Sequence, residues 1–206
     1  MIHRVLLIIS LVLLPYTVMA EEPNVIGVYE KVPGKKFVVN DGKVEILEFL
    51  SFYCGHCYQF EKAVPVIKGN FPKKISWKII PIYWGTGSSK PGEAYLLAEE
   101  EGKGAKMKKA LFETFFIDKQ DIGDIAVLEG LGVKVGMGFD FSRRLRAGDK
   151  AEEANAAIKM ANEYGISETP TLVIAGNMKV SGHMLQHSND LVRDNVIVML
   201  KSILEK

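Results

Sequence analysis

The spacing of apolar and polar residues divides the chain into a β-rich first part, a helical middle and a mixed end. Apolar, β-prone residues fill 36–39 and 44–52, and they return at 75–83. Between the last two of these strands, apolar residues recur at helical spacing over 54–69, and Pro65 inside this helix predicts a kink. Strand, helix and strand in about 40 residues predict a parallel β-α-β unit with a right-handed crossover.

From residue 88 to residue 147 the apolar spacing is helical throughout. Apolar residues three or four positions apart, separated by glycines, predict four helices, at 93–101, 105–117, 122–131 and 139–146. We expect 88–147 to be a small helical subdomain inserted into an α/β core.

The last part of the chain returns to a mixed pattern. A long helix is predicted at 149–164, where small and aliphatic residues share one face. Two short strands at 171–175 and 178–180 are joined by a Gly-Asn turn, which is typical of an antiparallel hairpin. Ser188 or Asn189 then caps a final amphipathic helix. The order of elements predicts one α/β domain with a helical insertion.

The N-terminus has the three parts of a secretory signal peptide. Arg4 precedes an apolar run at 5–14, and the small residue Ala20 stands where a signal peptidase would cut. The run is shorter than the roughly 20 residues of a membrane-spanning helix, which argues against an uncleaved anchor. We therefore expect a signal peptide at 1–20, cleavage near Ala20, and an exported mature domain at 21–206.

Composition and charge are those of a globular protein without an excess of either charge. The sequence is 48% hydrophobic, which is typical of a globular domain rather than of a disordered chain. It has 26 basic and 25 acidic side chains, and removal of the signal peptide takes away one basic residue, Arg4, and no acidic one. The mature chain is therefore electrically neutral, so its charge gives no reason to expect nucleic acid as a partner.

Cys54 and Cys57 are the two cysteines of the sequence, and they form a C-x-x-C motif where a helix is predicted to begin. Free backbone N–H groups and the helix dipole favour a thiolate at Cys54, and His56 would add a hydrogen bond or a positive charge. Cys57, one turn further on, should be buried and protonated. A disulfide between Cys54 and Cys57 would close a very short loop and would therefore stabilise the fold little. We expect instead a redox couple in which a substrate thiolate attacks Cys54, and this reaction needs no cofactor.

Other interpretations of the motif are less well supported. A zinc site made by the two cysteines with His183 and His187 would join halves about 125 residues apart, far more than the usual spacing. Covalent haem needs histidine directly after the second cysteine, where Tyr58 stands. We therefore expect no metal. We expect His183 and His187 to be loop residues just before the last helix. The alternative is that they contact the substrate.

Glu48 and Lys78 are charged residues within apolar strands. If Leu47 and Phe49 face one layer of helices, Glu48 faces the other. A buried carboxylate beneath the thiols could carry the proton of Cys57. Because a buried charge is costly unless it is paired, Lys78 in the next strand is the natural partner of Glu48.

Thr169 and Pro170 precede the strand at 171–175. Proline is tolerated at the first residue of a strand, but an X-Pro bond beside a site is also where cis peptides occur. A cis bond here would leave the backbone of Thr169 free to pair with an extended substrate. Both residues are therefore candidates for substrate binding.

The segment 48–61, EFLSFYCGHCYQFE, resembles the active-site segment of the thioredoxin superfamily and, within it, of the DsbA family of periplasmic disulfide oxidases. The resemblance covers nearly all of the mature chain, and the helices at 88–147 stand at the family's position. It implies a thioredoxin-like fold with an inserted helical subdomain, a monomer in the periplasm, folding cysteine-containing proteins as substrates, and reoxidation by a membrane protein of the DsbB type.

The same resemblance assigns roles to individual residues. It implies that Cys54 is the exposed nucleophile and Cys57 its buried partner, and that Pro170 is the cis-proline. It also implies that Glu48 and Lys78 are the buried acid and its ion-pair partner.

We interpret the sequence as an exported thiol:disulfide oxidoreductase that donates the Cys54–Cys57 disulfide through a mixed disulfide on Cys54. A disulfide reductase or isomerase, and a non-catalytic chaperone module that binds peptides, remain alternatives. Gly55 stands where the best-known oxidases carry proline, and Thr169 stands where they carry valine. Both residues adjoin the thiols, so the redox potential and the choice of partner stay open at this point.

Overall fold

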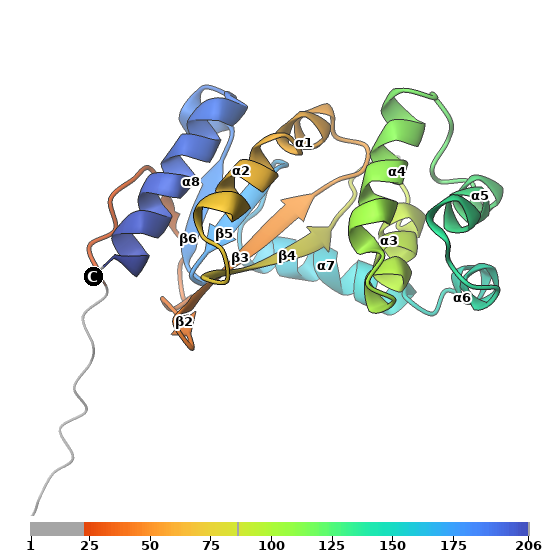
Figure 1. Ribbon diagram of the computed structural model, residues 1–206, viewed down its shortest axis with the longest axis horizontal. Helices are drawn as coiled ribbons and strands as arrows, with labels where there is room; N and C mark the ends of the chain where they lie inside the picture. The colour runs from red at the N-terminus through yellow and green to blue at the C-terminus, as the bar shows by residue number, and fades with distance from the viewer. Residues whose placement is uncertain (1–22, 86, 206) are drawn as a thin grey trace, which may run out of the picture.

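The computed structural model describes residues 23–85 and 87–205, so the predicted signal peptide at 1–20 lies outside the described residues. Within that part of the chain a mixed sheet has the order β1-β6-β5-β3-β2, and β4 also pairs with β3 (Figure 1). The strands are β1 (Glu30–Lys31), β2 (Val39–Asn40), β3 (Lys43–Leu50), β4 (Ile75–Pro81), β5 (Thr171–Ile174) and β6 (Met178–Ser181). The helices are α1 (Gly55–Phe60), α2 (Ala63–Asn70), α3 (Lys90–Glu100), α4 (Gly104–Phe116), α5 (Ile125–Val135), α6 (Asp140–Ala147), α7 (Ala151–Glu163) and α8 (Asn189–Leu204), with the 3₁₀-helix η1 (His183–Leu185) before α8.

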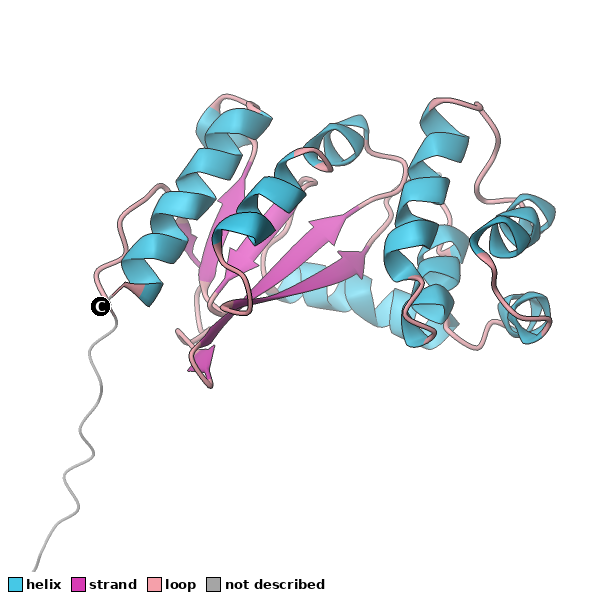
Figure 2. Ribbon diagram, in the orientation of Figure 1, coloured by secondary structure: helices cyan, strands magenta, loops and turns pink. Residues whose placement is uncertain are grey.

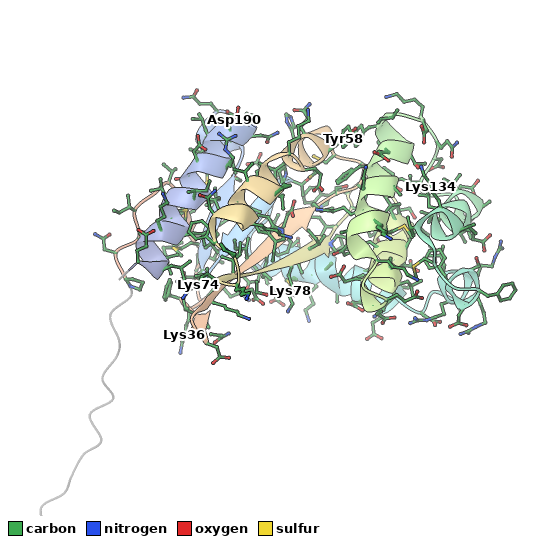
Figure 3. The ribbon with its side chains drawn as sticks, viewed as in Figure 1. Lys36, Tyr58, Lys74, Lys78, Lys134 and Asp190 are labelled. Atoms are coloured by element: carbon green, nitrogen blue, oxygen red, sulfur yellow. The ribbon has the colours of Figure 1, made fainter. Side chains whose placement is uncertain are left out.

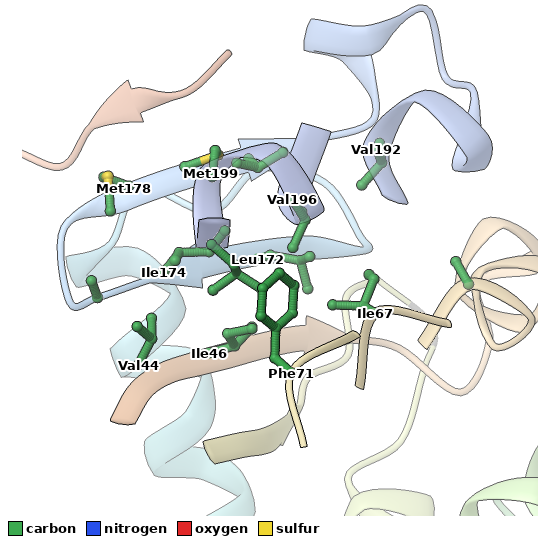
Figure 4. Packing of buried hydrophobic residues seen from close by; sticks show 14 of the residues in the cluster. Val44, Ile46, Ile67, Phe71, Leu172, Ile174, Met178, Val192, Val196 and Met199 are labelled. Carbon is green, nitrogen blue, oxygen red and sulfur yellow. The ribbon is translucent and has the colours of Figure 1, made fainter. Parts of the chain in front are cut away.

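Strand β3 is the centre of the fold, because it pairs in parallel with β4 and antiparallel with β5 and both of its faces are covered. Ile46 packs in a core with α2 and α8, whereas Leu47 and Phe49 pack in another core with α7. Figure 1 shows α2 and α8 on one side of the sheet and α7 on the other. In Figure 4 the side chains from β3, β5, α2 and α8 gather in one shared core. The predicted parallel β-α-β unit is confirmed by the β3–β4 pairing.

The helix predicted over 54–69 is broken into α1 and α2, and the break is not at Pro65 itself. It falls at Glu61 and Lys62, which lie between the two helices. A proline ring clashes with the carbonyl four residues earlier and supplies no N–H to it, and for Pro65 that carbonyl belongs to Glu61. Glu61 therefore lies between the two helices, where its side chain contacts Lys108 of α4.

The four helices predicted within 88–147 are α3 to α6, and they lie beyond one edge of the sheet (Figure 2). Leu97, Leu111 and Leu128 pack in a core that also includes Phe52 and Cys57. The helical part of the molecule and the redox motif thus share one hydrophobic core. No helix among the described residues is long and apolar enough to cross a membrane.

The N-terminal part differs from the sequence prediction. A strand was expected at 36–39, but the structure has β2 at Val39–Asn40 and a further strand, β1, at Glu30–Lys31. Strand β1 pairs with β6 at the edge of the sheet, and both of its residues are exposed. Two exposed residues carry no alternation of apolar and polar positions, so the sequence pattern could not mark them as a strand.

Candidate active site

Cys54 is the N-cap of α1, at the point where the chain leaves β3. Its Sγ accepts a hydrogen bond from the backbone N–H of Cys57 at 3.4 Å, and in its protonated form the thiol donates to the carbonyl oxygen of Thr169 at 3.2 Å. The backbone N–H of Cys54 donates to the carbonyl of Ser51, which forms the turn between strand and helix. The strand-to-helix junction predicted from the sequence thus places the sulfur among the free N–H groups of a helix start.

The pKa of the Cys54 thiol is lowered to about 5. The largest cause is a hydrogen bond from the Cys57 thiol; burial opposes it, and contacts from Thr169 and the N–H groups of Cys57 and His56 reinforce it. At neutral pH Cys54 is therefore a thiolate, as its helix position predicted. His56 contributes through its backbone N–H, whereas its exposed imidazole faces the ring of His187.

Cys57 has the opposite environment. Its side chain is fully buried, in the core shared with the inserted helices, and both cysteines are free thiols in this structure. Burial is the largest cause that holds the pKa of Cys57 well above its usual value. The pair therefore contains one stabilised thiolate, Cys54, and one protonated thiol, Cys57.

Thr169 lies against the thiol of Cys54, and a cis peptide bond joins it to Pro170, as the sequence suggested. The next residue, Thr171, is buried, and its hydroxyl donates to the carbonyl of Glu168 at 2.8 Å. This contact holds the loop in place. The loop therefore brings the backbone of Thr169 up to the reactive sulfur.

Glu48 is completely buried on the face of β3 predicted for it. Its Oε2 accepts a hydrogen bond from Nε1 of Trp77 at 2.7 Å, while Oε1 has no partner among the described residues. Burial raises the pKa of Glu48 to about 7, although the positive charge of Lys108 and the bond from Trp77 lower it. A carboxyl group with this pKa can both release and take up a proton at neutral pH.

The structure does not pair Lys78 with Glu48, so the expected ion pair is wrong. The ammonium group of Lys78 lies 3.5 Å from Glu45, and its side chain is 65% exposed. In the parallel register Lys78 lies beside Leu47, so it points to the face opposite Glu48. Trp77, one residue earlier, faces Glu48 instead. Figure 3 shows Lys78 far from Tyr58 of α1.

Lys108 of α4 is the residue that the sequence interpretation missed. Its Nζ lies 2.8 Å from Oε1 of Glu61, at the break between α1 and α2, and its side chain is only 11% exposed. Its charge is the second-largest influence on the pKa of Glu48. The signal for it was present, because Lys108 interrupts the apolar face that α4 forms with Met107 and Leu111.

Replacing Lys108 with methionine is expected to raise the pKa of Glu48 by about one unit. The reason is that Lys108 supplies a positive charge that favours the carboxylate, and its loss also leaves the negative charge of Glu61 uncompensated. The measurement is a carbon-13 NMR titration of the Glu48 carboxyl group. Lys78→Met is the matched control and should leave the titration unchanged. Equal shifts in the two variants would contradict the assignment.

The described residues contain no group of three or more histidine, cysteine, aspartate or glutamate side chains that could hold a metal ion. The zinc arrangement of both cysteines with His183 and His187 is therefore not formed. His183 instead lies 3.4 Å from Glu168, and His187 faces His56.

Comparison with known proteins shows which family shares this arrangement. Residues 45–190 match the family model of the DSBA-like thioredoxin domain. The thiol:disulfide interchange protein DsbA of Azotobacter vinelandii is 27% identical over 154 residues, which cover 73% of this chain and 71% of the relative. The protein of the same name from Haemophilus influenzae is 26% identical over 170 residues, covering 79% and 80%.

Solved structures with the same fold include a variant of Pseudomonas aeruginosa DsbA, with a TM-score of 0.75 and 16% identity over 87% of this chain and 97% of the other. The oxidoreductase DsbA of Xylella fastidiosa has a TM-score of 0.71 and 22% identity, covering 86% and 96%. A cysteine-to-serine variant of Proteus mirabilis DsbA, solved with a non-covalently bound peptide, has a TM-score of 0.68 and 18% identity, covering 87% and 97%. These similarities confirm the predicted thioredoxin-like fold.

Proposed function

The chain belongs to the DSBA-like thioredoxin family and is a thiol:disulfide oxidoreductase, and from this premise we propose that it is an oxidase that donates its disulfide to folding proteins. The observation that carries the proposal is the low pKa of Cys54, about 5. A stabilised thiolate favours the reduced protein, so the oxidised protein gives its disulfide away readily.

The first step is the attack of a substrate thiolate on Sγ of Cys54 in the oxidised protein. A new S–S bond joins the substrate to Cys54, and the Cys54–Cys57 bond breaks with its electron pair on Cys57. The pKa of Cys57 is held well above the usual value, so this sulfur takes up a proton at once. Glu48 is the proton donor that we propose for this step, because it faces the same side of β3 as Leu50, which shares a core with Cys57.

The second step releases the product. A second substrate thiolate attacks the substrate sulfur of the mixed disulfide, and Cys54 leaves as a thiolate. A leaving sulfur departs faster when its pKa is low, so the environment that stabilises the Cys54 thiolate also speeds this step. The substrate leaves with a disulfide, and the protein remains as the dithiol.

The backbone of Thr169 supports a place for the substrate chain in this scheme. Its carbonyl lies 3.2 Å from Sγ of Cys54. An extended peptide whose cysteine reaches this sulfur can therefore hydrogen-bond to Thr169 beside Pro170. We propose cysteine-containing exported proteins as substrates, the periplasm as location after cleavage near Ala20, a monomeric state, and a membrane protein of the DsbB type as reoxidant.

The direction of the reaction is tested by the equilibrium of the mature chain, residues 21–206, with reduced and oxidised glutathione. An oxidase is expected to have a reduction potential above about −180 mV, whereas a value near about −270 mV, typical of thioredoxin, would make it a reductase. The fraction of disulfide is read from alkylation of Cys54 and mass spectrometry. Refolding of a reduced, cysteine-containing substrate by the oxidised protein then measures the oxidase activity directly.

A further inference from the structure

The three histidines of the described residues lie around the redox motif, although they are far apart in the sequence. His56 belongs to α1, His183 to η1, and His187 to the loop before α8. The rings of His56 and His187 are 6.1 Å apart between centroids, with 31° between their planes, and both side chains are exposed. His183 instead turns to Glu168, at 3.4 Å.

A groove of about 520 Å³ begins at His187, beside His56, and runs between α1, α2 and the start of α8. Its charged lining residues are Lys62, Asp190 and Arg193, together with His187. Arg193 is neutralised, because it contacts Asp190 at 2.6 Å and Asp194 at 2.7 Å. The ammonium group of Lys62 has no ion-pair partner among the described residues. Figure 3 shows Asp190 of α8 and Tyr58 of α1 both along the top of the view.

We propose that His56, His187 and Lys62 form a subsite for a carboxylate side chain of the substrate, a few residues from the cysteine that reacts with Cys54. This inference rests on the proposed oxidase function and specifies its substrates: the protein prefers cysteines in acidic segments. The subsite adjoins the nucleophile because His56 lies within the C-x-x-C motif itself.

The physical reason is charge complementarity at the mouth of the site. Two adjacent imidazoles that gain protons repel each other, and a carboxylate between them accepts a charge-assisted hydrogen bond from each. Lys62 adds a further positive charge at the groove. The other charged groups nearby are Asp190, Arg193 and Asp194 on α8, where one guanidinium contacts two carboxylates. This cluster carries one net negative charge, so the attraction for a substrate carboxylate comes from His56, His187 and Lys62 alone. Contacts of this kind near a surface are worth about fivefold in binding.

The test compares the rates at which the oxidised mature chain oxidises two short peptides that differ only in Glu or Gln on both sides of one cysteine. Glu also changes the pKa and the reactivity of the peptide thiol, and this effect is the same for every variant of the protein. We therefore take the Glu/Gln rate ratio of the natural protein and divide it by the Glu/Gln rate ratio of His187→Asn. Asparagine suits this position, where φ is 54°. We expect a quotient of about five at pH 5.5 and low salt, decreasing toward one at pH 8 and at high salt.

His183→Asn is the matched control, since it removes an exposed histidine outside the groove. It should keep the Glu/Gln ratio of the natural protein, whereas Lys62→Met should lower this ratio at every pH. A quotient of one at pH 5.5 would overturn the subsite, and rapid oxidation of the Gln peptide would then show that the oxidase function stands without it. Oxidation of neither peptide would refute the oxidase function and the subsite together.

Discussion

Replacing Cys54 with serine is expected to abolish oxidation of peptide thiols, and the remaining Cys57 is expected to exchange with a disulfide peptide at least about a hundredfold more slowly than Cys54 does in Cys57→Ser. Cys57→Ser should also stop turnover, but it should accumulate a mixed disulfide on Cys54. The measurement is the rate of adduct formation with a disulfide peptide, followed by mass spectrometry.

The reason is burial rather than thiolate supply alone. A low pKa provides more thiolate at Cys54, but it also makes that thiolate a weaker nucleophile, so the two effects largely cancel. Cys57 is fully buried, however, and its pKa is held well above the usual value. It can react only when the structure opens locally. Similar adduct rates for the two single-cysteine variants would contradict the assignment of Cys54 as the accessible nucleophile.

The reduced protein is expected to gain stability relative to the oxidised protein as the pH rises from 4 to 8.5. The thiol of Cys54 has a pKa of about 5 in the folded, reduced chain and an ordinary value of 9.0 in an unfolded one. A lowered pKa stabilises the fold above the unfolded value, and this contribution is lost as the pH falls through the folded value. The oxidised chain has no such thiolate, so the difference between the two forms isolates Cys54.

The size of this difference follows from the two pKa values. At pH 7 the reduced form should have gained about 1 to 2 kcal/mol relative to pH 4, after allowance for the partly exposed sulfur. The measurement is denaturant unfolding of both redox forms at each pH, because the loop entropy removed by the disulfide does not depend on pH. A difference that stays constant between pH 4 and 8.5 would show that the folded chain does not stabilise the thiolate.

Gly55 stands where the family's best-known oxidases carry proline, and the structure shows whether the backbone requires glycine there. It occupies the first position of α1, where proline is well accepted, and an added Cβ would meet only Phe116, at 3.8 Å. The backbone there does not require glycine. Packing and backbone conformation therefore leave room for proline at this position. We expect any effect of Gly55 to be on the reduction potential, which the glutathione equilibrium measures.

The sequence by itself determined the chemistry at the thiols. A strand of period two followed by a helix places Cys54 at a helix start, where the Cys57 thiol three residues later is the largest cause of its lowered pKa and local N–H groups lower it further. The same alternation buries Glu48 on the face opposite Leu47. The helix start at Cys54 and the face of the strand that carries Glu48 depend on neighbours within a few residues, so spacing along the chain was sufficient to predict them.

Only the tertiary structure decided which groups surround that chemistry. Lys78 lies in the neighbouring strand but on the opposite face from Glu48, and the charge near Glu48 comes from Lys108, on an inserted helix. His187 likewise meets His56 across more than half of the chain. Pairing of charges depends on distance and direction in space, which the register of the sheet and the packing of α4 and α8 set. For residues on different helices or strands, spacing along the sequence gives neither the distance between the side chains nor their direction.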